Sequence, residues 1–273
     1  MGRNAQCVAV VALLFIVAYL GSHQSRRLQS GMTARGDRFV QRKGQNSIRL
    51  LSHSRPVGLT GGGDRYDVEE PPPQETATVT QPAPEFEGMA VMPDSSFKKL
   101  KLDHFKGRWL ILLFYPLDFT FVCPTELTAF SDRMGKFEGL NASVVGVSID
   151  SHYTHLQWTK TPRTEGGVGN LKYPLLSDIT REIGEVYGCM HPDGHHVRGT
   201  FIIDPKGTIR HITLNDPPVG RNADEVIRLV EGYQYSDKYG QVCPHGWRQG
   251  DASIEPDPVK KARYFETLKQ SSQ

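Results

Sequence analysis

The sequence contains no Cys-x-x-Cys pair, and its four cysteines, Cys7, Cys123, Cys189 and Cys243, are widely separated. Four cysteines in 273 residues are too few for a small disulfide-stabilised scaffold. Their spacing also excludes zinc-ribbon, thioredoxin-type dithiol and c-type haem motifs. No glycine-rich loop has the GxGxxG or P-loop form, so nucleotide binding is not expected. The formal net charge of +2 lacks the basic excess of a nucleic-acid-binding protein, so no nucleic-acid partner is expected.

No apolar run reaches the roughly 20 residues that a membrane-spanning helix needs. The run from Cys7 to Leu20 has 14 uncharged residues, follows Arg3 and precedes Gly21 and Ser22, which is typical of a signal peptide. A signal anchor or a mitochondrial presequence is the alternative, and membrane attachment is expected only if residues 7–20 remain as an anchor. Residues 23–60 are rich in Arg, Ser and Gln, as in a transit peptide, although a disordered linker would look the same.

The domain boundaries follow from these shifts in composition. We predict a signal peptide or anchor at 1–22, a transit-like or disordered linker at 23–82, a folded domain at 83–240 and a C-terminal segment with a tail helix at 241–273. The leader predicts an organellar location, a complex plastid or a mitochondrion, with the endoplasmic reticulum or secretion as the alternative.

The globular part alternates between strand and helix patterns. The apolar run 109–115 and the run 143–149 predict two buried strands, and the apolar spacing in 125–137 predicts one helix between them. Residues 201–203 and 209–214 flank a turn at 204–207, as in a hairpin. Asn222 and Glu225 have the spacing of a capping box that begins a further helix. This order predicts an α/β sandwich.

Cys123 lies where a buried strand is expected to give way to a helix. Pro124 follows it, and proline is favoured at the first position of a helix. The unpaired N–H groups and the dipole of a helix N-terminus stabilise an anion, and the thiolate is the reactive form of cysteine. Thr120, three residues earlier, can bring a hydroxyl to the same place. An inert buried cysteine is the alternative.

The segment YPLDFTFVCPTE at 115–126 resembles the active-site segment of the typical 2-Cys peroxiredoxins, and VCPHGW at 242–247 resembles their resolving-cysteine segment. The resemblance extends from about residue 83 to about residue 265, and it includes RGTFIID at 198–204 and PVGR at 218–221. It implies a thioredoxin-like fold with a central mixed sheet flanked by helices. It also implies the reduction of hydrogen peroxide and organic hydroperoxides without a metal or other cofactor.

The resemblance also implies a role for each matching residue. Cys123 would be the peroxidatic cysteine, and Cys243 the resolving cysteine, supplied by the partner subunit of a homodimer that can assemble into a decamer. The active site would be completed by Pro116, Thr120 and Arg198, with Glu126, Arg221 and Trp158 in support. The Cys123–Cys243 disulfide would be reduced by thioredoxin or a similar dithiol. An overoxidation-triggered holdase chaperone and a peroxide-signalling relay are the alternative functions.

Two further segments concern overoxidation of the catalytic sulfur. Residues 166–169, GGVG, resemble the GGLG loop of the family with Val168 in place of leucine, and Tyr264 and Phe265 resemble its YF motif. Gly166, Gly167, Gly169 and the YF pair imply a sensitive enzyme, in which a slow rearrangement leaves the sulfenic acid open to a second peroxide.

Two other groups of residues have no assigned role. Cys189 is expected to be a small buried or half-buried thiol. His191, His195 and His196 form a histidine-rich loop that we interpret as solvated, because their spacing lacks a supporting carboxylate or cysteine pair. No metal site is therefore expected.

Overall fold

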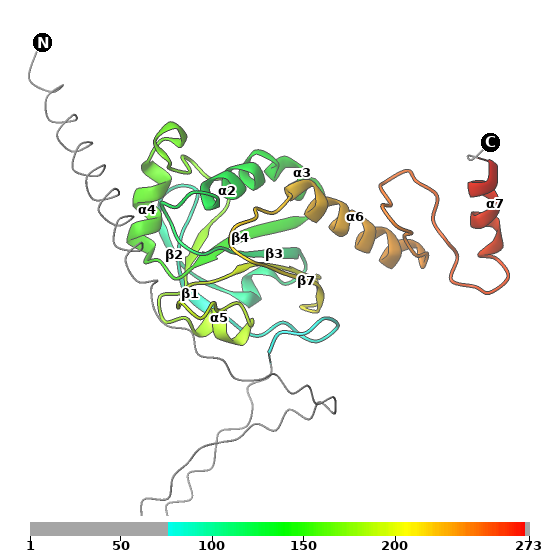
Figure 1. The fold of residues 1–273 in the computed structure, drawn as a ribbon. Coiled ribbons are helices and arrows are strands. Elements are labelled where there is room, and N and C mark those ends of the chain that lie inside the picture. Colours follow the sequence, from blue (N-terminus) through cyan, green and yellow to red (C-terminus); the bar gives the residue numbers. More distant parts are fainter. Residues whose placement is uncertain (1–75, 271–273) are drawn as a thin grey trace, which may run out of the picture. The chain divides into compact units, whose positions relative to one another are not determined.

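A computed structural model describes residues 76–270, with side chains described as far as Thr267. These residues form a seven-stranded mixed sheet with helices against both faces (Figure 1). The strands are β1 (Glu87–Val91), β2 (Phe97–Lys101), β3 (Trp109–Phe114), β4 (Ala142–Ser148), β5 (Leu175–Ser177), β6 (Arg198–Ile203) and β7 (Ile209–Asn215). Their order across the sheet is β2-β1-β5-β4-β3-β6-β7. The predicted α/β architecture with a central mixed sheet is confirmed.

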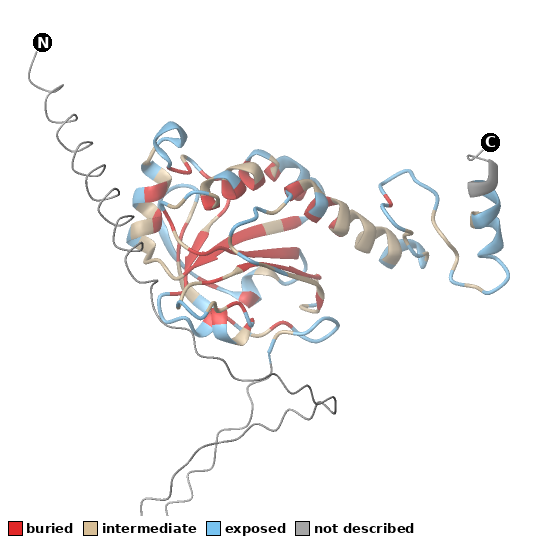
Figure 2. Cartoon of the chain, in the orientation of Figure 1, coloured by how far each residue is buried: buried red, intermediate tan, exposed pale blue. Residues whose placement is uncertain are grey.

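The central strand β3 explains the continuous apolar run in the sequence. It pairs in parallel with β4 and antiparallel with β6, and every one of its residues is buried. Trp109, Ile111 and Leu113 belong to one hydrophobic core, whereas Leu110 and Leu112 belong to a second core. Alternate side chains of a strand point to opposite faces, so a strand covered on both faces is apolar throughout. Figure 2 shows this burial concentrated in the sheet.

The helices are α2 (Cys123–Asp132), α3 (Met134–Gly139), α4 (His152–Lys160), α5 (Glu182–Val186), α6 (Ala223–Tyr239) and α7 (Ala262–Gln270), with short 3-10 turns at Leu102–Phe105 and Arg163–Glu165. The prediction of a single helix over 125–137 was wrong, because the chain breaks at Arg133, between α2 and α3. The Arg133 guanidinium makes a bidentate ion pair with Asp224 at the start of α6, with N···O distances of 2.8 and 2.7 Å. Arg133 has a φ of −100° and a ψ of 7°, which lie outside helical geometry, so α2 and α3 are separate helices.

The predicted start of α6 and the predicted hairpin turn are confirmed. Asn222 is the N-cap, and its side chain accepts a hydrogen bond from the Asp224 amide at 2.9 Å. The capping box is only half formed, because the Glu225 carboxylate pairs with Arg228 and does not return to the cap. Asp204 closes the turn between β6 and β7 by accepting from the Lys206 amide at 2.9 Å.

The two ends of the described chain differ in how they pack. The amides of Ala77 and Thr80 already donate to carbonyls of Val186 and Ile209, so the segment before β1 is bound to the domain. Beyond α6 the chain folds back once, where Val242 and Ile254 exchange two backbone hydrogen bonds. The leader predicted at 1–22 and most of the linker predicted at 23–82 lie outside the described residues. Among the described residues, no helix is long and apolar enough to cross a bilayer.

Candidate active site

Cys123 is the first residue of α2, at the predicted handover from strand to helix. Strand β3 ends at Phe114, a loop follows, and Pro124 occupies the first turn of the helix. The N-cap is Val122, whose side chain makes no capping hydrogen bond. Pro124 has no N–H, and the amides of Thr125 and Glu126 donate to the Val122 carbonyl at 3.0 and 3.3 Å, so the Cys123 amide is the one in this first turn that can face an anion. The thiol itself is almost fully buried, with 1% of its surface exposed.

A guanidinium faces the sulfur. Arg198, the first residue of β6, donates from Nη1 to the Cys123 Sγ at 3.3 Å and to Glu126 Oε2 at 2.6 Å. Its Nε donates to the Pro217 carbonyl at 2.6 Å, which fixes the plane of the guanidinium. Arg198 and Glu126 are both buried, so these charges act on one another with little screening by water.

Arg221 completes the buried charge network. Its Nε donates to Glu126 Oε1 at 2.8 Å, and its Nη2 donates to Oε2 at 3.1 Å. Its Nη1 donates to the carbonyls of Phe114 and Gly199 at 2.8 and 2.6 Å, which ties the ends of β3 and β6 together. Two guanidiniums thus face one carboxylate. The network carries one excess positive charge, and a thiolate on Cys123 would neutralise it.

Thr120 and Pro116, in the loop before Cys123, differ in their exposure to solvent. Pro116 is buried, whereas Thr120 is half-buried and donates its hydroxyl proton to the Leu117 carbonyl at 2.9 Å. The Thr120 oxygen therefore has lone pairs to offer, and a donor role towards peroxide would require the hydroxyl to rotate. Phe119 adopts a left-handed φ of 54°, which favours glycine, and Phe121 is 92% exposed. The loop is held in a conformation that its own sequence does not favour.

A buried network that the sequence analysis missed holds this loop. The Tyr115 hydroxyl donates to Asp118 Oδ1 at 2.8 Å, and Asp118 Oδ2 lies 2.8 Å from His155 Nδ1 on α4. The Asp118 amide donates in turn to Asp150 at 2.9 Å. Burial raises the pKa of Asp118, and the neighbouring His155 opposes that rise. Asp118 stands three residues after Tyr115, but nothing in the spacing signals that His155 lies beside it.

Trp158 on α4 connects this loop to the GGVG segment. Its ring lies 5.9 Å from that of Phe119, and its Nε1 donates to the Gly166 carbonyl at 3.0 Å. A side chain at Gly167 would have its Cβ 2.0 Å from the Thr161 carbonyl oxygen, so only glycine fits there. Val168 is fully buried in the core that contains Cys123 and Trp158. The GGVG segment is therefore a packed element of the domain, with Val168 accommodated in the core.

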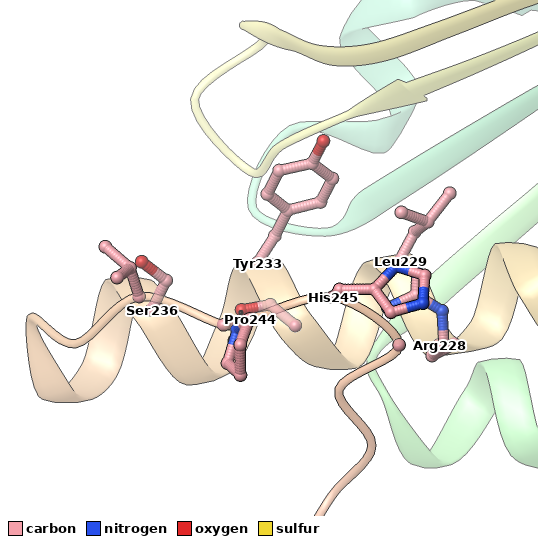
Figure 3. A pocket seen from close by; sticks show the side chains of 10 residues that line it. Arg228, Leu229, Tyr233, Ser236, Pro244 and His245 are labelled. Carbon is pink, nitrogen blue, oxygen red and sulfur yellow. Dashed lines mark hydrogen bonds between the residues drawn. The ribbon is translucent and has the colours of Figure 1, made fainter. Parts of the chain in front are cut away.

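Cys243 lies in a separate pocket of about 410 Å³ beside α6. Its Sγ is 3.5 Å from the Gly232 carbonyl oxygen, and Figure 3 shows Arg228, Tyr233 and His245 around the same pocket. Burial raises the pKa of the Cys243 thiol, and the positive charge of Arg228 opposes that rise. Trp247 is buried close by.

The two cysteines lie at opposite ends of β3. Arg221, next to the Cys123 site, bonds the carbonyl of the last residue of β3, whereas Tyr233, next to Gly232 and Cys243, stacks on its first residue, Trp109. Six residues of strand span about 16 Å. A disulfide requires Cα atoms about 4.4–6.8 Å apart, so one folded chain does not bring these two sulfurs together.

The remaining candidates lie elsewhere. Tyr264 and Phe265 are in α7, where Tyr264 is half-buried and Phe265 is exposed. Cys189 is fully buried beneath Gly199, and burial raises the pKa of its thiol far above the ordinary value. His196 is also buried and bonds Asp178, so the interpretation of His191, His195 and His196 as one solvated loop was wrong for His196.

Two family models and several known proteins match the sequence of this chain. Residues 79–212 match the family model described as the AhpC/TSA family, and residues 232–267 match the C-terminal domain of 1-Cys peroxiredoxin. Human peroxiredoxin-4 is 54% identical over 193 residues, which cover 70% of this chain and 71% of that protein. Peroxiredoxin-1 of Gekko japonicus is 53% identical and covers 67% of this chain and 92% of its own length.

Solved structures give the same result. The reduced 2-Cys peroxiredoxin of Plasmodium vivax superimposes with a TM-score of 0.68 at 41% identity, covering 69% of this chain and 98% of its own. Thioredoxin peroxidase I of Plasmodium yoelii superimposes with a TM-score of 0.57 at 39% identity, covering 63% of this chain and 100% of its own.

Proposed function

Because this chain belongs to the AhpC/TSA family of peroxiredoxins and is a thiol peroxidase, we propose that Cys123 is the sulfur that the hydroperoxide oxidises. The observation that carries the proposal is the 3.3 Å contact between Arg198 Nη1 and Cys123 Sγ at the start of α2. A thiolate there has a guanidinium and the positive end of the α2 dipole beside it, which also suit the negative charge that develops on the leaving oxygen.

The first step is a displacement on oxygen. The Cys123 thiolate attacks one peroxide oxygen, a sulfur–oxygen bond forms, and the oxygen–oxygen bond breaks. The leaving alkoxide or hydroxide takes a proton and departs as alcohol or water, while the sulfur becomes a sulfenic acid. Arg198 stabilises the departing oxygen, Thr120 orients the peroxide, and Pro116 forms an apolar wall. Glu126 and Arg221 hold the Arg198 guanidinium in position, and Trp158 packs against the loop.

The second step uses Cys243 of a partner subunit. Its thiol displaces the hydroxyl of the sulfenic acid, so that a disulfide forms and water leaves. The positions of the two cysteines at opposite ends of β3 support a partner as the source, and we propose a homodimer that can assemble into a decamer. A thioredoxin-like dithiol then reduces the disulfide by exchange. No cofactor takes part. The comparisons favour neither a holdase chaperone nor a signalling relay over the peroxidase.

A subunit-mixing experiment tests both assignments. Cys123→Ser and Cys243→Ser chains are each expected to lose turnover with a dithiol reductant. Mixed together, exchanged and treated with one equivalent of peroxide, they are expected to form a disulfide-linked dimer on a non-reducing gel. Neither chain alone should form that disulfide. If native peroxide consumption persists in Cys123→Ser, the assignment of the catalytic sulfur is wrong; if the mixture forms no linked dimer, the partner assignment is wrong.

We also propose that residues 1–22 are a signal peptide or anchor and that residues 23–82 are a transit-like stretch or a linker, which together direct the chain to an organelle, with the secretory route as the alternative. The apolar run at 7–20 supports this, and the family match begins only at residue 79. Sequencing the N-terminus of the mature protein and imaging a fusion of residues 1–80 test the proposal. A mature protein that begins at Met1 would contradict cleavage.

We propose separately that Cys123 is sensitive to overoxidation. The packed GGVG segment around Gly166, Gly167 and Gly169 supports it, because this segment braces Trp158 and through Trp158 the loop before Cys123. Tyr264 and Phe265 would act through α7. Mass spectrometry of Cys123 after repeated turnover measures the sulfinic acid that a slow rearrangement should allow.

A further inference from the structure

Three potential metal ligands meet in the loop between α5 and β6. One ligand atom each of His191, Asp193 and His195 lies within 4.8 Å of the other two. This group is the only one of its kind found among residues 76–267. We propose that this His-Asp-His cluster binds a divalent transition-metal ion. Asp193 supplies the carboxylate that the spacing of the histidines was not expected to provide, and the site lies apart from the cysteine chemistry.

The loop holds the two imidazoles together without a metal. The His191 amide donates to the His195 carbonyl at 2.8 Å, and the Gly194 amide donates to the His191 carbonyl at 2.9 Å. Gly194 has a φ of 85°, which only glycine adopts freely, and its carbonyl accepts from Arg181 Nε at 2.8 Å. The two imidazole rings stack with centroids 4.6 Å apart and planes 5° apart. The loop backbone is therefore arranged before any ion binds, and the two imidazoles, whose lone pairs do not converge while the rings are parallel, would turn to ligate a common ion.

The hydrogen bonds of each imidazole assign its tautomer. His195 Nδ1 lies 2.9 Å from the His196 carbonyl and donates to it, so Nε2 carries the lone pair. A histidine that ligates a metal commonly donates its other ring N–H to a carbonyl in this way. His191 Nδ1 accepts from the Asp193 amide at 3.1 Å, so its one lone pair is engaged, and an ion that binds at Nδ1, 3.6 Å from Asp193 Oδ2, would replace that hydrogen bond.

The separation of His191 Nδ1 and Asp193 Oδ2 suits a small cation. Zinc binds nitrogen and carboxylate oxygen at about 2.0–2.2 Å, which places two ligands of a tetrahedral ion about 3.3 Å apart. The 3.6 Å separation of His191 Nδ1 and Asp193 Oδ2 is close to that value. The Asp193 side chain is 78% exposed, so it can move the remaining few tenths of an ångström at little cost.

His196, where the loop joins β6, is held by hydrogen bonds and is not one of the three proposed ligands. His196 is buried with its Nε2 2.9 Å from Asp178 Oδ2, and Asp178 also accepts the amides of Ile183 and Gly184 at 3.1 and 2.7 Å. This anchor fixes the point where the loop enters β6. The cluster above it can exchange water for an ion without disturbing the fold.

The ligand types define the class of ion. Two imidazoles and one carboxylate suit zinc, cobalt, nickel or copper, whereas calcium and magnesium prefer sets made of oxygen alone. Three protein ligands leave at least one position open to water or another small ligand. His195 precedes Arg198 by three residues, yet neither His191 nor His195 contacts Cys123 or its partners in the structure. The proposal is therefore independent of the peroxidase mechanism.

Calorimetric titration with Co²⁺ tests the site. The parent is the full chain with Cys7→Ser, Cys123→Ser and Cys243→Ser, which leaves the fully buried Cys189 as its one cysteine. We expect one equivalent of Co²⁺ to bind, with affinity reduced at least tenfold by His191→Ala, by His195→Ala and by Asp193→Asn. The matched controls His152→Ala and Asp216→Asn replace exposed or half-exposed residues outside the cluster and should bind as the parent does.

A spectroscopic readout covers the case in which a variant is destabilised. Electron paramagnetic resonance of the parent with one equivalent of Cu²⁺ should show coupling to two nitrogens, and each single histidine variant should show one fewer. Co²⁺ should also raise the thermal midpoint of the parent but not of the variant with both histidines replaced. Equal stoichiometry and affinity in the parent and that double variant would overturn the proposal, as would a Cu²⁺ spectrum without nitrogen coupling.

Discussion

Replacing Arg198 with methionine removes the positive charge that faces the catalytic sulfur. The guanidinium Nη1 is 3.3 Å from Cys123 Sγ, and both groups are buried. Two opposite charges about 4 Å apart attract by about 4 kcal/mol when the effective dielectric constant is near 20. The substitution leaves one guanidinium, that of Arg221, to balance both the Glu126 carboxylate and a thiolate. Since about 1.4 kcal/mol corresponds to a factor of ten in rate, we expect the rate constant with hydrogen peroxide to fall by about 10²- to 10³-fold.

Stopped-flow tryptophan fluorescence measures this rate constant, because Trp158 shares a core with Cys123. Arg198→Lys keeps the charge but loses the Nε hydrogen bond to the Pro217 carbonyl that fixes the group beside the sulfur, so an intermediate loss is expected. Arg210→Met is the matched control, since it removes an arginine of the same sheet that pairs with the exposed Asp237. An Arg198→Met protein that is folded and reacts within threefold of the native rate would refute the charge argument.

Three further outcomes are expected. Glu126→Gln leaves two buried guanidiniums without their counterion and should lower the free energy of unfolding by about 3–5 kcal/mol in urea titrations; an unchanged midpoint would contradict this. Burial raises the pKa of Cys243, so the rate of disulfide formation should still be rising above pH 9 in stopped-flow traces, and Arg228→Gln should move that rise to higher pH; a rate independent of pH would contradict it. Gly167→Ala should lower the melting temperature, because its Cβ would meet the Thr161 carbonyl at 2.0 Å; the matched Gly139→Ala, with open space around it, should not.

The sequence predicted those parts of the fold that depend on local patterns. The run of apolar residues in β3, the proline after Cys123 and the Asn222 cap each act within a few residues, and each is found where it was expected. The single helix over 125–137 failed because the chain leaves helical geometry at Arg133, whose guanidinium pairs with Asp224, 91 residues away. Nothing in the local spacing of either residue signals such a pairing.

In the candidate site, too, the residues with local sequence signals were predicted and those brought together by packing were not. Cys123 could be identified from its neighbours, and the resemblance supplied Arg198, which the structure places at the sulfur. The brace formed by Tyr115, Asp118 and His155 could not be predicted, because it depends on how α4 packs against the loop. Asp193, by contrast, was overlooked although it stands two residues from both His191 and His195 in the sequence, so this carboxylate was visible in the local spacing.

The burial of Cys189 has a practical consequence for experiments on this chain. Cys123 and Cys189 are similarly buried, with 1% and 0% of their surfaces exposed, but the first accepts a hydrogen bond from a guanidinium, whereas burial raises the pKa of the second despite the charge of Arg221. Solvent access therefore cannot rank their reactivity, whereas local charge can. A mild alkylating reagent should modify Cys189 only when the sheet opens as a whole. The rate at which Cys189 is alkylated therefore reports the rate of global unfolding. Mass spectrometry measures it without an engineered reporter group.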